Sequence, residues 1–533
     1  MEHLGLVAGM YEELGIGEVI DRVIKQDMDQ RQVSIGQAVK AMVLNGLGFA
    51  NRRLYLTPHF FAHKPSEALI GEGVSADKLN DDTLGKALDA LHGYGVSELY
   101  SLLAAQAVKR LGLEPKVGHQ DTTSFHVDGK YNQDEAPDAD AGIVHITHGY
   151  SRDSKPDLAQ VALELIHEHQ ASLPVVLQVV SGNQNDKTTM QTSVALHVKQ
   201  LKHVGIELLV KDSAGYSAGA LQAHQEVGLK WVMPVPATLN EVKKLCAEVD
   251  LSKMEPLAEG YRYCKIRSNY GGIEQRWLVI ASQASAKRAA KSVHRQLLQQ
   301  TQDEQKAFAK LCRQEFHCAE DALQALQTFR QTLEVLEILA PQVIERRHRS
   351  QKGRPAAEAL PVRVSYRLQA NLAAPCSLRQ QRIERASLFV LATNQLDQQA
   401  LPDTEILQTY KGQSKVERGF RFLKDPMFLA NTLYLKKVER IMALLMVMTI
   451  CLLVYAALEH RIRSTLSKHQ ATIPDQKGKP TSNPTARWVF ELFLDVHLLQ
   501  ITNHSIHTLT LNLKAELRSL LKLLGDSYVM AYP

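Results

Sequence analysis

The stretch KVGHQDTTSFHV at residues 116–127 marks the point where the apolar pattern of this chain changes. Before it, apolar residues recur at helical spacing, and Ser34 followed by Gln37 forms a capping-box pattern at the start of one helix. Within it, the pattern becomes the alternation that is typical of a strand. The sequence therefore predicts a helical region up to about residue 115 and a sheet that begins at residue 117.

The residues that follow predict a mixed sheet. Asp128-Gly129 indicates a turn, so residues 143–150 are expected to return as the antiparallel partner of the first strand. Apolar runs predict a second strand pair, at 161–166 and 174–180. Helices and short strands then alternate, with a helix at 187–203, a strand at 206–210, a helix at 217–227 and a strand at 231–235. This order is typical of an α/β fold.

Breaks in the pattern divide the chain into five expected parts. Hairpin and long charged helical patterns interrupt the sheet after residue 236, which indicates an α+β insertion. A strand and a helix then resume the sheet domain, and this helix ends at Asp425-Pro426 because proline cannot make the helical hydrogen bond. The parts are a helical N-terminal domain (1–115), the first part of the sheet domain (116–236), the insertion (237–387), the second part of the sheet domain (388–465) and a C-terminal linker with a helical tail (466–533).

The composition is that of an ordinary globular protein. Hydrophobic residues make up 45% and charged residues 22% of the 533 residues, which excludes a mainly disordered or fibrous chain. The net charge of +5 permits an acidic polymer as partner but does not by itself indicate one. The six cysteines form no C-x-x-C pair, and no signal-peptide pattern opens the sequence. We therefore expect a cytoplasmic protein without a disulfide framework or a thiolate zinc site.

Residues 441–458, IMALLMVMTICLLVYAAL, carry no charge and reach the length of about 18 residues at which a helix can span a membrane. Positive residues flank the run on both sides, whereas membrane topology favours one side. The rest of the chain has no second run of this kind. We therefore expect a buried core helix and no membrane association.

Two aspartates stand where a sheet would present carboxylates. Asp121 lies within the first strand, where a lone buried carboxylate is costly unless it is paired or binds a metal. Asp212 follows the apolar run IELLV, at the carboxyl end of a strand, where open α/β sheets bind their ligands. We expect these two side chains to meet, although each alone also fits an aspartate that caps a turn.

A third acidic residue, Glu417, lies in a helix predicted from about Glu405 to Lys424, within its segment YKGQSKVERGFRFLK that begins at Tyr410. At about 100° per residue, Tyr410, Glu417 and Lys424 share one face of a continuous helix. Gln413 and Arg421 join the same stripe, which surrounds a carboxylate with groups that can bind phosphate. A salt-bridged polar stripe on a purely structural helix would show the same pattern.

Histidines near these acids are weaker candidates. His119 shares the strand face of Asp121 and His126 does not, so only His119 is expected to approach the site. The run HEH at residues 167–169 looks like a metal cluster, but it falls at a predicted strand turn. A solvated turn is the simpler interpretation.

With these residues in place, the chain resembles the DDE transposases of bacterial insertion sequences. Residues 410–424 are similar to the signature Y-x2-R-x3-E-x6-K of one group among them, the Tyr-Arg-Glu-Lys group, with Gln413 in the place of the arginine. The runs GYSRDSKPDL at 149–158 and SGNQND at 181–186 also resemble segments of that group. The resemblance covers about residues 116–460, most of the chain.

The resemblance implies a ribonuclease H-like fold for the sheet domain, with the insertion before the third acid. It implies that Asp121, Asp212 and Glu417 are catalytic and hold two Mg²⁺ or Mn²⁺ ions, with the first aspartate bridging both. The residues that it places against DNA are Tyr410, Gln413, Arg421 and Lys424. Among them, Gln413 lacks the positive charge of the group's arginine.

The implied function is a transposase that cuts the ends of its own element and transfers the strands to target DNA. Its partners would be double-stranded DNA, including the terminal inverted repeats and the target, and a second copy of the chain in the DNA complex. The N-terminal domain and the insertion are expected to supply most of the DNA recognition, because the acidic trio repels phosphates. Two other functions would share this fold: a catalytically silent DNA-binding or interaction protein, and a nuclease without strand transfer.

Overall fold

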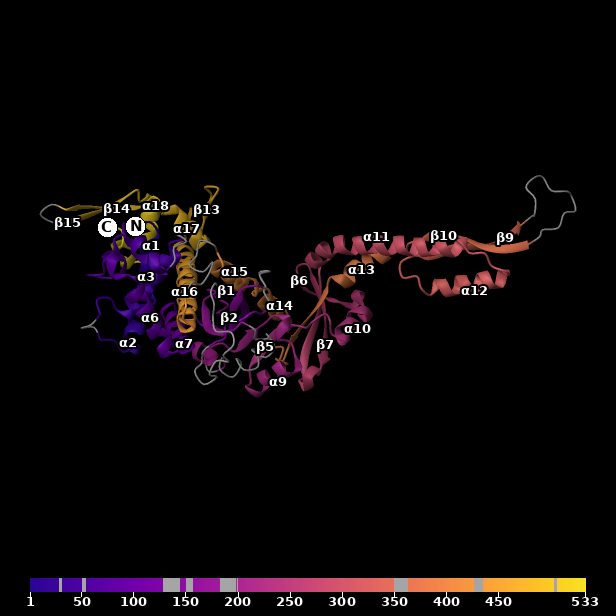
Figure 1. Cartoon of the computed structure of the whole chain (residues 1–533), viewed down its shortest axis with the longest axis horizontal. Helices are drawn as coiled ribbons and strands as arrows, with labels where there is room; N and C mark the ends of the chain where they lie inside the picture. The colour runs from indigo at the N-terminus through magenta and orange to yellow at the C-terminus, as the bar shows by residue number, and fades with distance from the viewer. Residues whose placement is uncertain are drawn as a thin grey trace. The chain divides into compact units, whose positions relative to one another are not determined.

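The computed structural model describes residues 1–27, 31–49, 54–127, 144–149, 157–182, 198, 200–348, 363–425, 435–502 and 506–533. For residues 414–417, 502 and 506 it describes the backbone alone. The chain forms two compact units, which are coloured by residue number in Figure 1. The first comprises Met1–Pro234, Ser268–Arg276 and Ala392–Pro533, and the second comprises Val235–Arg267 and Trp277–Leu391. The second unit spans nearly the residues of the expected insertion.

The N-terminal residues of the first unit fold into helices. Their bounds are Leu4–Glu13 (α1), Ile16–Val23 (α2), Ile35–Leu47 (α3), Thr57–Phe61 (α4), Ser66–Ile70 (α5), Asp81–Tyr94 (α6) and Val96–Arg110 (α7). As the sequence predicts, Ser34 and Gln37 form a capping box at the start of α3. Helices α1, α3, α6 and α7 pack against the long helix α16 (Val438–Lys468).

Helix α16 contains the apolar run predicted from the sequence. Among the described residues it is the one helix that is long and apolar enough to cross a membrane, by length and composition only. Within the fold, however, 89% of its most apolar 18-residue stretch is buried. The N-terminal helices, strand β3 (Pro174–Ser181) and helix α18 (Ala515–Leu524) cover it. This placement is that of the expected core helix.

The C-terminal segment packs on the N-terminal helices, and Figure 1 shows the two ends of the chain side by side, in indigo and yellow. The Tyr528 hydroxyl donates to Glu13 Oε2 and the Tyr532 hydroxyl donates to the Glu2 carbonyl, both at 2.6 Å. The elements of the segment are α17 (Ala486–Leu492), β14 (His497–Thr502), β15 (Ile506–Leu511), α18 and α19 (Asp526–Met530). One hydrophobic core runs through α1, α16, α18 and the sheet, so the boundary expected near residue 115 does not separate two cores.

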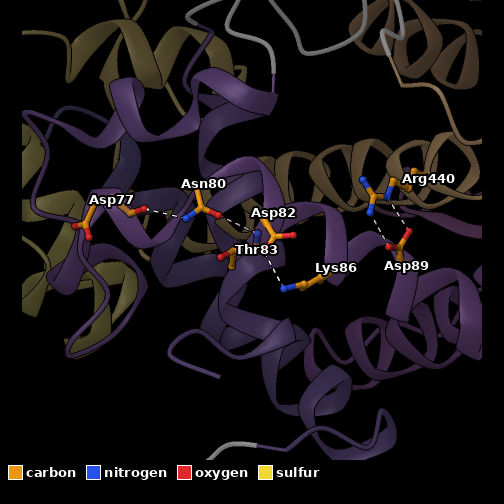
Figure 2. Close-up of polar contacts among 7 residues, drawn as sticks. All are labelled: Asp77, Asn80, Asp82, Thr83, Lys86, Asp89 and Arg440. Carbon is orange, nitrogen blue, oxygen red and sulfur yellow. Dashed lines mark hydrogen bonds and ion pairs between the residues drawn. The ribbon is translucent and has the colours of Figure 1, made fainter. Parts of the chain in front are cut away.

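Arg440, near the start of α16, holds α6 through a two-pronged ion pair. Its Nε and Nη2 each donate to a carboxylate oxygen of Asp89 at 2.7 Å (Figure 2). The hydrogen bond to the guanidinium lowers the pKa of the Asp89 carboxyl. Figure 2 also shows a second pair, between Lys86 and Asp82, within α6 itself. The first pair therefore ties two helices together, whereas the second does not.

We expect Asp89→Asn to lower the free energy of unfolding by about 0.5–1 kcal/mol at neutral pH, a modest loss because solvent screens a partly exposed pair. Since the folded-state pKa of Asp89 is lowered, the contribution is complete above the unfolded-state pKa of about 3.9 and is lost as the pH falls through the folded-state value. Urea unfolding at neutral pH and near pH 3 measures both terms. Asp82→Asn is the control and should change stability less. An equal loss at both pH values would contradict the ion pair.

The strands of the first unit follow the sheet order β3-β2-β1-β4-β5. Their bounds are Val117–Val127 (β1), Ala159–Glu168 (β2), Pro174–Ser181 (β3), Leu208–Val210 (β4) and Lys230–Pro234 (β5). β1 pairs antiparallel with β2 and β2 with β3, whereas β4 is parallel to β1 and to β5. Helix α9 (Ala218–Glu226) connects the two parallel strands β4 and β5. This order and these directions are the ribonuclease H-like arrangement, so the predicted fold class is confirmed.

The partner of β1 differs from the prediction. The sequence predicts a returning strand at 143–150, but β1 pairs along its length with β2. In its described part, the predicted strand contributes a single isolated bridge, at Thr147. The physical reason is that β2 offers a longer run of buried side chains, whereas the predicted strand is short and interrupted by polar residues. The predicted turn at 128–129 and most of the predicted helix at 187–203 lie outside the described residues.

The second unit combines a strand series with a long helical arm. Its strands follow the order β11-β8-β7-β6, and the sequence-predicted hairpin at Gly271-Gly272 joins β7 to β8 with both glycines at positive φ. Away from them, β9 and β10 form an antiparallel hairpin that packs on α11 and α12. The bounds are Asn240–Glu248 (α10), Glu255–Ala258 (β6), Tyr261–Ser268 (β7), Gln275–Ser282 (β8), Gln283–Arg313 (α11), Ala319–Arg330 (α12), Glu337–His348 (β9), Arg363–Ala373 (β10), Leu378–Ala386 (α13) and Leu388–Thr393 (β11).

Candidate active site

Two of the three predicted acids come from adjacent parallel strands. Asp121 lies within β1, and Asp212 follows the end of β4 by two residues. β4 runs beside β1 with His119 opposite Val210, and continuing this register by two residues brings Asp121 opposite Asp212. Residues opposite each other share a sheet face, and neighbouring strands lie about 4.8 Å apart. Both aspartates are half-buried. Continued to Asp212, this register places both aspartates on one face of the sheet.

Each aspartate also bonds to its own backbone. Asp121 Oδ1 accepts the N–H of Thr122 at 2.8 Å. Asp212 Oδ1 accepts the N–H of Ala214 at 3.1 Å and caps the short 3₁₀ turn that follows β4. The capping role that the sequence left open for Asp212 is thus present, and it fixes the orientation of a carboxylate at the carboxyl end of the strand.

The third acid, Glu417, lies on a helix that contacts β1. The sequence predicts one continuous helix here, but the structure has two: α14 (Asp403–Lys411) and α15 (Ser414–Leu423). They meet at Gly412 and Gln413, which both keep right-handed helical angles. Glu417 lies on α15, and its side chain is outside the described part of the structure. Contacts between α15 and β1 bring its helix to the strand of Asp121.

The side-chain amide of Gln413 links this helix to the sheet by hydrogen bonding. Its Nε2 donates to the Gln120 carbonyl at 2.9 Å, and His119 Nδ1 lies 3.3 Å from its Oε1. His119, on the same sheet face as Asp121, is buried and contacts Gln413. Of the other predicted DNA-binding residues, Tyr410 lies on α14, Arg421 is exposed on α15 and Lys424 is the C-cap of α15.

A buried polar cluster lies under the two aspartates, on the opposite face of the sheet. Gln120 donates its side-chain amide to the carboxylate of Glu164 on β2. Lys211, between β4 and Asp212, is completely buried. Burial lowers the pKa of Lys211 to about 8, while the carboxylates of Glu164 and Asp212 act in the opposite direction. Lys211 is thus a buried lysine whose charged form burial opposes and the two neighbouring carboxylates favour.

This cluster was not predicted, although the sequence carries a signal for it. Gln120, Glu164 and Lys211 are polar residues within or beside strands whose neighbours are apolar, which marks buried groups that need partners. The HEH run is not the solvated turn expected from the sequence: His167 and Glu168 lie at the end of β2 and are buried, and the turn begins only after them. Glu168 closes the turn between β2 and β3, because its carboxylate accepts the N–H groups of residues 170, 171 and 173.

The chemistry of the site suits a hard divalent cation. Asp121 and Asp212 supply carboxylate oxygens, which Mg²⁺ and Mn²⁺ prefer, and no cysteine stands beside them. Among the residues with described side chains, no group of three or more His, Cys, Asp or Glu is placed to hold a metal ion. A third ligand would have to come from a side chain such as that of Glu417, which is not among them.

Two family models match the chain. Residues 121–454 match a family described as a transposase DDE domain, and residues 1–105 match one described as a domain of unknown function, DUF4277. No curated protein matches the chain. Among solved structures, the chain aligns with a cryo-EM structure of a piggyBac transposase synaptic complex with hairpin DNA, at 10% identity and a TM-score of 0.37, over 90% of this chain and 78% of that chain.

Proposed function

Because the chain belongs to the family of the transposase DDE domain, we propose that it cuts double-stranded DNA at the ends of its own element and joins these ends to target DNA. The family makes the chain a DNA transposase, an enzyme that works with divalent metal ions. The observation that carries the proposal is the parallel pairing of β1 with β4, inside the matched residues: Asp121 lies in β1 and Asp212 follows β4 by two residues.

In this proposal, Asp121, Asp212 and Glu417 would hold two Mg²⁺ or Mn²⁺ ions. When bound, such a pair of ions activates the attacking oxygen and stabilises the leaving oxygen of a phosphodiester. The chain's own contribution is to bring the two aspartates to adjacent strands through β1 and β4 and to place Lys211 beside Asp212 and Glu164. The similarity of residues 410–424 to the Tyr-Arg-Glu-Lys signature supports Glu417 as the third acid.

We also propose that Tyr410, Arg421 and Lys424 bind DNA phosphates near the cut, and that two copies of the chain act on the two inverted repeats of the element. Most DNA affinity would come from the N-terminal helices and the second unit. In the second unit, Lys287, Arg288, Lys291 and Arg295 are exposed and lie within about 100° of each other on α11. This half of α11 contains no acidic residue.

Replacing these four basic residues of α11 by alanine should weaken DNA binding and lower its salt dependence. Each lost phosphate contact reduces the slope of log K against log salt by about 0.9. Titrating a fluorescent duplex at several salt concentrations measures the slope. Lys306→Ala with Lys310→Ala, on the same helix next to acidic residues, is the control and should leave the slope unchanged. An unchanged slope in the fourfold variant would exclude this face of α11 as a phosphate-binding surface.

The proposed reaction is tested with the full-length protein, Mg²⁺ and a labelled duplex taken from the DNA that flanks its gene. Cleavage at one position followed by joining to a plasmid is the expected result. Cleavage without joining would identify a nuclease. Binding without cleavage would identify a catalytically silent DNA-binding protein on the same fold.

A further inference from the structure

We infer that Gln413 is a positioning residue, which docks the helix of Glu417 on β1 and so sets the third acid against Asp121. This inference rests on the proposed function, because it assigns Gln413 a role in the same site. It replaces the expectation that Gln413 contacts DNA.

The hydrogen bonds of Gln413 use both ends of its side-chain amide. Nε2 donates to the carbonyl of Gln120, the residue directly before Asp121, at 2.9 Å. Oε1 lies 3.3 Å from Nδ1 of the buried His119, so it can accept from that nitrogen when the nitrogen carries the proton. An amide provides a donor and an acceptor on one rigid plane. The first turn of α15 is thereby fixed to the strand that carries Asp121.

Gly412 makes this close approach possible. A Cβ atom at Gly412 would lie 2.8 Å from Cε1 and Nε2 of the His119 ring, a distance at which something must shift. The backbone angles of Gly412 are those of an ordinary helix, so crowding against His119, rather than φ, is what opposes a side chain here. Two residues after Glu417, Gly419 plays a similar part. A Cβ atom at Gly419 would lie 3.1 Å from Nε2 of His167.

Two buried histidine rings, those of His119 and His167, lie against the helical segment. His167 is buried, and burial lowers the pKa of its imidazole to about 3, so the ring is neutral. Its ring meets Phe420 of α15 edge to face, with the centroids 6.2 Å apart. The neutral His167 ring and the two glycines allow the helical segment to pack closely on the sheet. Gln413 supplies the polar contact that fixes its position.

Arginine, the residue of the resembled signature, cannot replace both bonds. A guanidinium can donate to the Gln120 carbonyl, but it has no acceptor for His119 Nδ1 and would place a charge beside a buried ring. A DNA contact and a docking contact at this position therefore predict opposite results for Gln413→Arg. A DNA contact should gain affinity for the duplex, whereas a docking contact should lose turnover.

The experiment compares full-length Gln413→Ala, Gln413→Arg and Gly412→Ala with two controls. Gln408→Ala removes an exposed amide from the same helical segment, and Gly93→Ala adds a methyl group where no atom lies within 4 Å. Three quantities are measured: the Mg²⁺-dependent cleavage rate on the gene-flanking duplex, the affinity for that duplex, and hydrogen exchange of the amides of residues 414–425 without DNA.

We expect each of the three test variants to cut about 10–100-fold more slowly, to keep its duplex affinity within about twofold, and to exchange the 414–425 amides faster. The controls should match the parent protein. A loss confined to duplex affinity, or a gain of affinity in Gln413→Arg with full turnover, would overturn the inference in favour of a DNA contact. Unchanged exchange would also overturn it. If the parent protein cuts no DNA, the proposed function fails, and the exchange measurement still decides whether Gln413 docks the helix.

Discussion

Asp121→Asn is expected to lower the rate of DNA cleavage by about 10³-fold or more while the protein stays folded. The carboxylate charge is what would attract the metal ions, and asparagine removes it. The local hydrogen bond survives, because an asparagine Oδ1 can still accept the N–H of Thr122. Asp212→Asn should behave in the same way, since its oxygen can still accept from Ala214. Single-turnover cleavage measures the loss, and duplex affinity should remain.

Asp250→Asn is the matched control for these two variants. Like Asp212, Asp250 caps a short 3₁₀ turn, by accepting the N–H of Ser252 at 3.0 Å, but it lies in the second unit. This substitution makes the same chemical change in the local geometry of Asp212 and should leave cleavage intact. Cleavage by Asp121→Asn within tenfold of the parent rate would remove Asp121 from the catalytic site.

Removing divalent ions with EDTA is expected to stop cleavage entirely, without unfolding the chain. The proposed ligands are oxygens only, so Mg²⁺ or Mn²⁺ should restore the rate when added in excess. The fold itself should persist, because the buried Lys211 lies beside the carboxylates of Asp212 and Glu164. Circular dichroism before and after chelation checks the fold, and cleavage assays check the activity.

Titrating Mn²⁺ back into EDTA-treated Asp212→Asn provides the internal control. Losing one proposed ligand should raise the Mn²⁺ concentration that is needed for half of the remaining activity. Cleavage that continues in excess EDTA would contradict the metal-dependent mechanism. Unfolding on chelation would indicate a structural metal instead.

The strands of the first unit could be predicted because their patterns are local. The alternation at 116–127 and the apolar run before Asp212 each indicate a strand without knowledge of any neighbour. The partner of β1 could not be predicted in this way. The choice between residues 143–150 and β2 depends on which segment buries more apolar surface in the finished sheet, and the Asp128-Gly129 signal favoured the nearer one.

The candidate site was predictable to a similar extent. The local patterns predicted that Asp121 and Asp212 come from strands, whereas the adjacency of β1 and β4 is a property of the finished sheet. The role of Gln413 could not be predicted, because a helical wheel gives the face of a side chain but not its partner. Its bonds to the Gln120 carbonyl and to His119 depend on how α15 packs against β1. Lys211 was missed because one polar residue after a strand resembles a turn residue until its burial is known.

The packing of the two chain ends has a consequence for biosynthesis. Glu13 bonds to Tyr528 and Glu2 to Tyr532, across 515 and 530 residues of sequence. Helix α16, against which the first helices pack, is also made late. Until α16 and the C-terminal segment have been translated, α1 and α3 therefore lack the surfaces that cover them. Their apolar faces stay exposed for most of the synthesis time. The nascent chain should be a strong client for chaperones, and a product whose translation stops before residue 438 should be degraded rather than accumulate as a partial DNA-cutting enzyme.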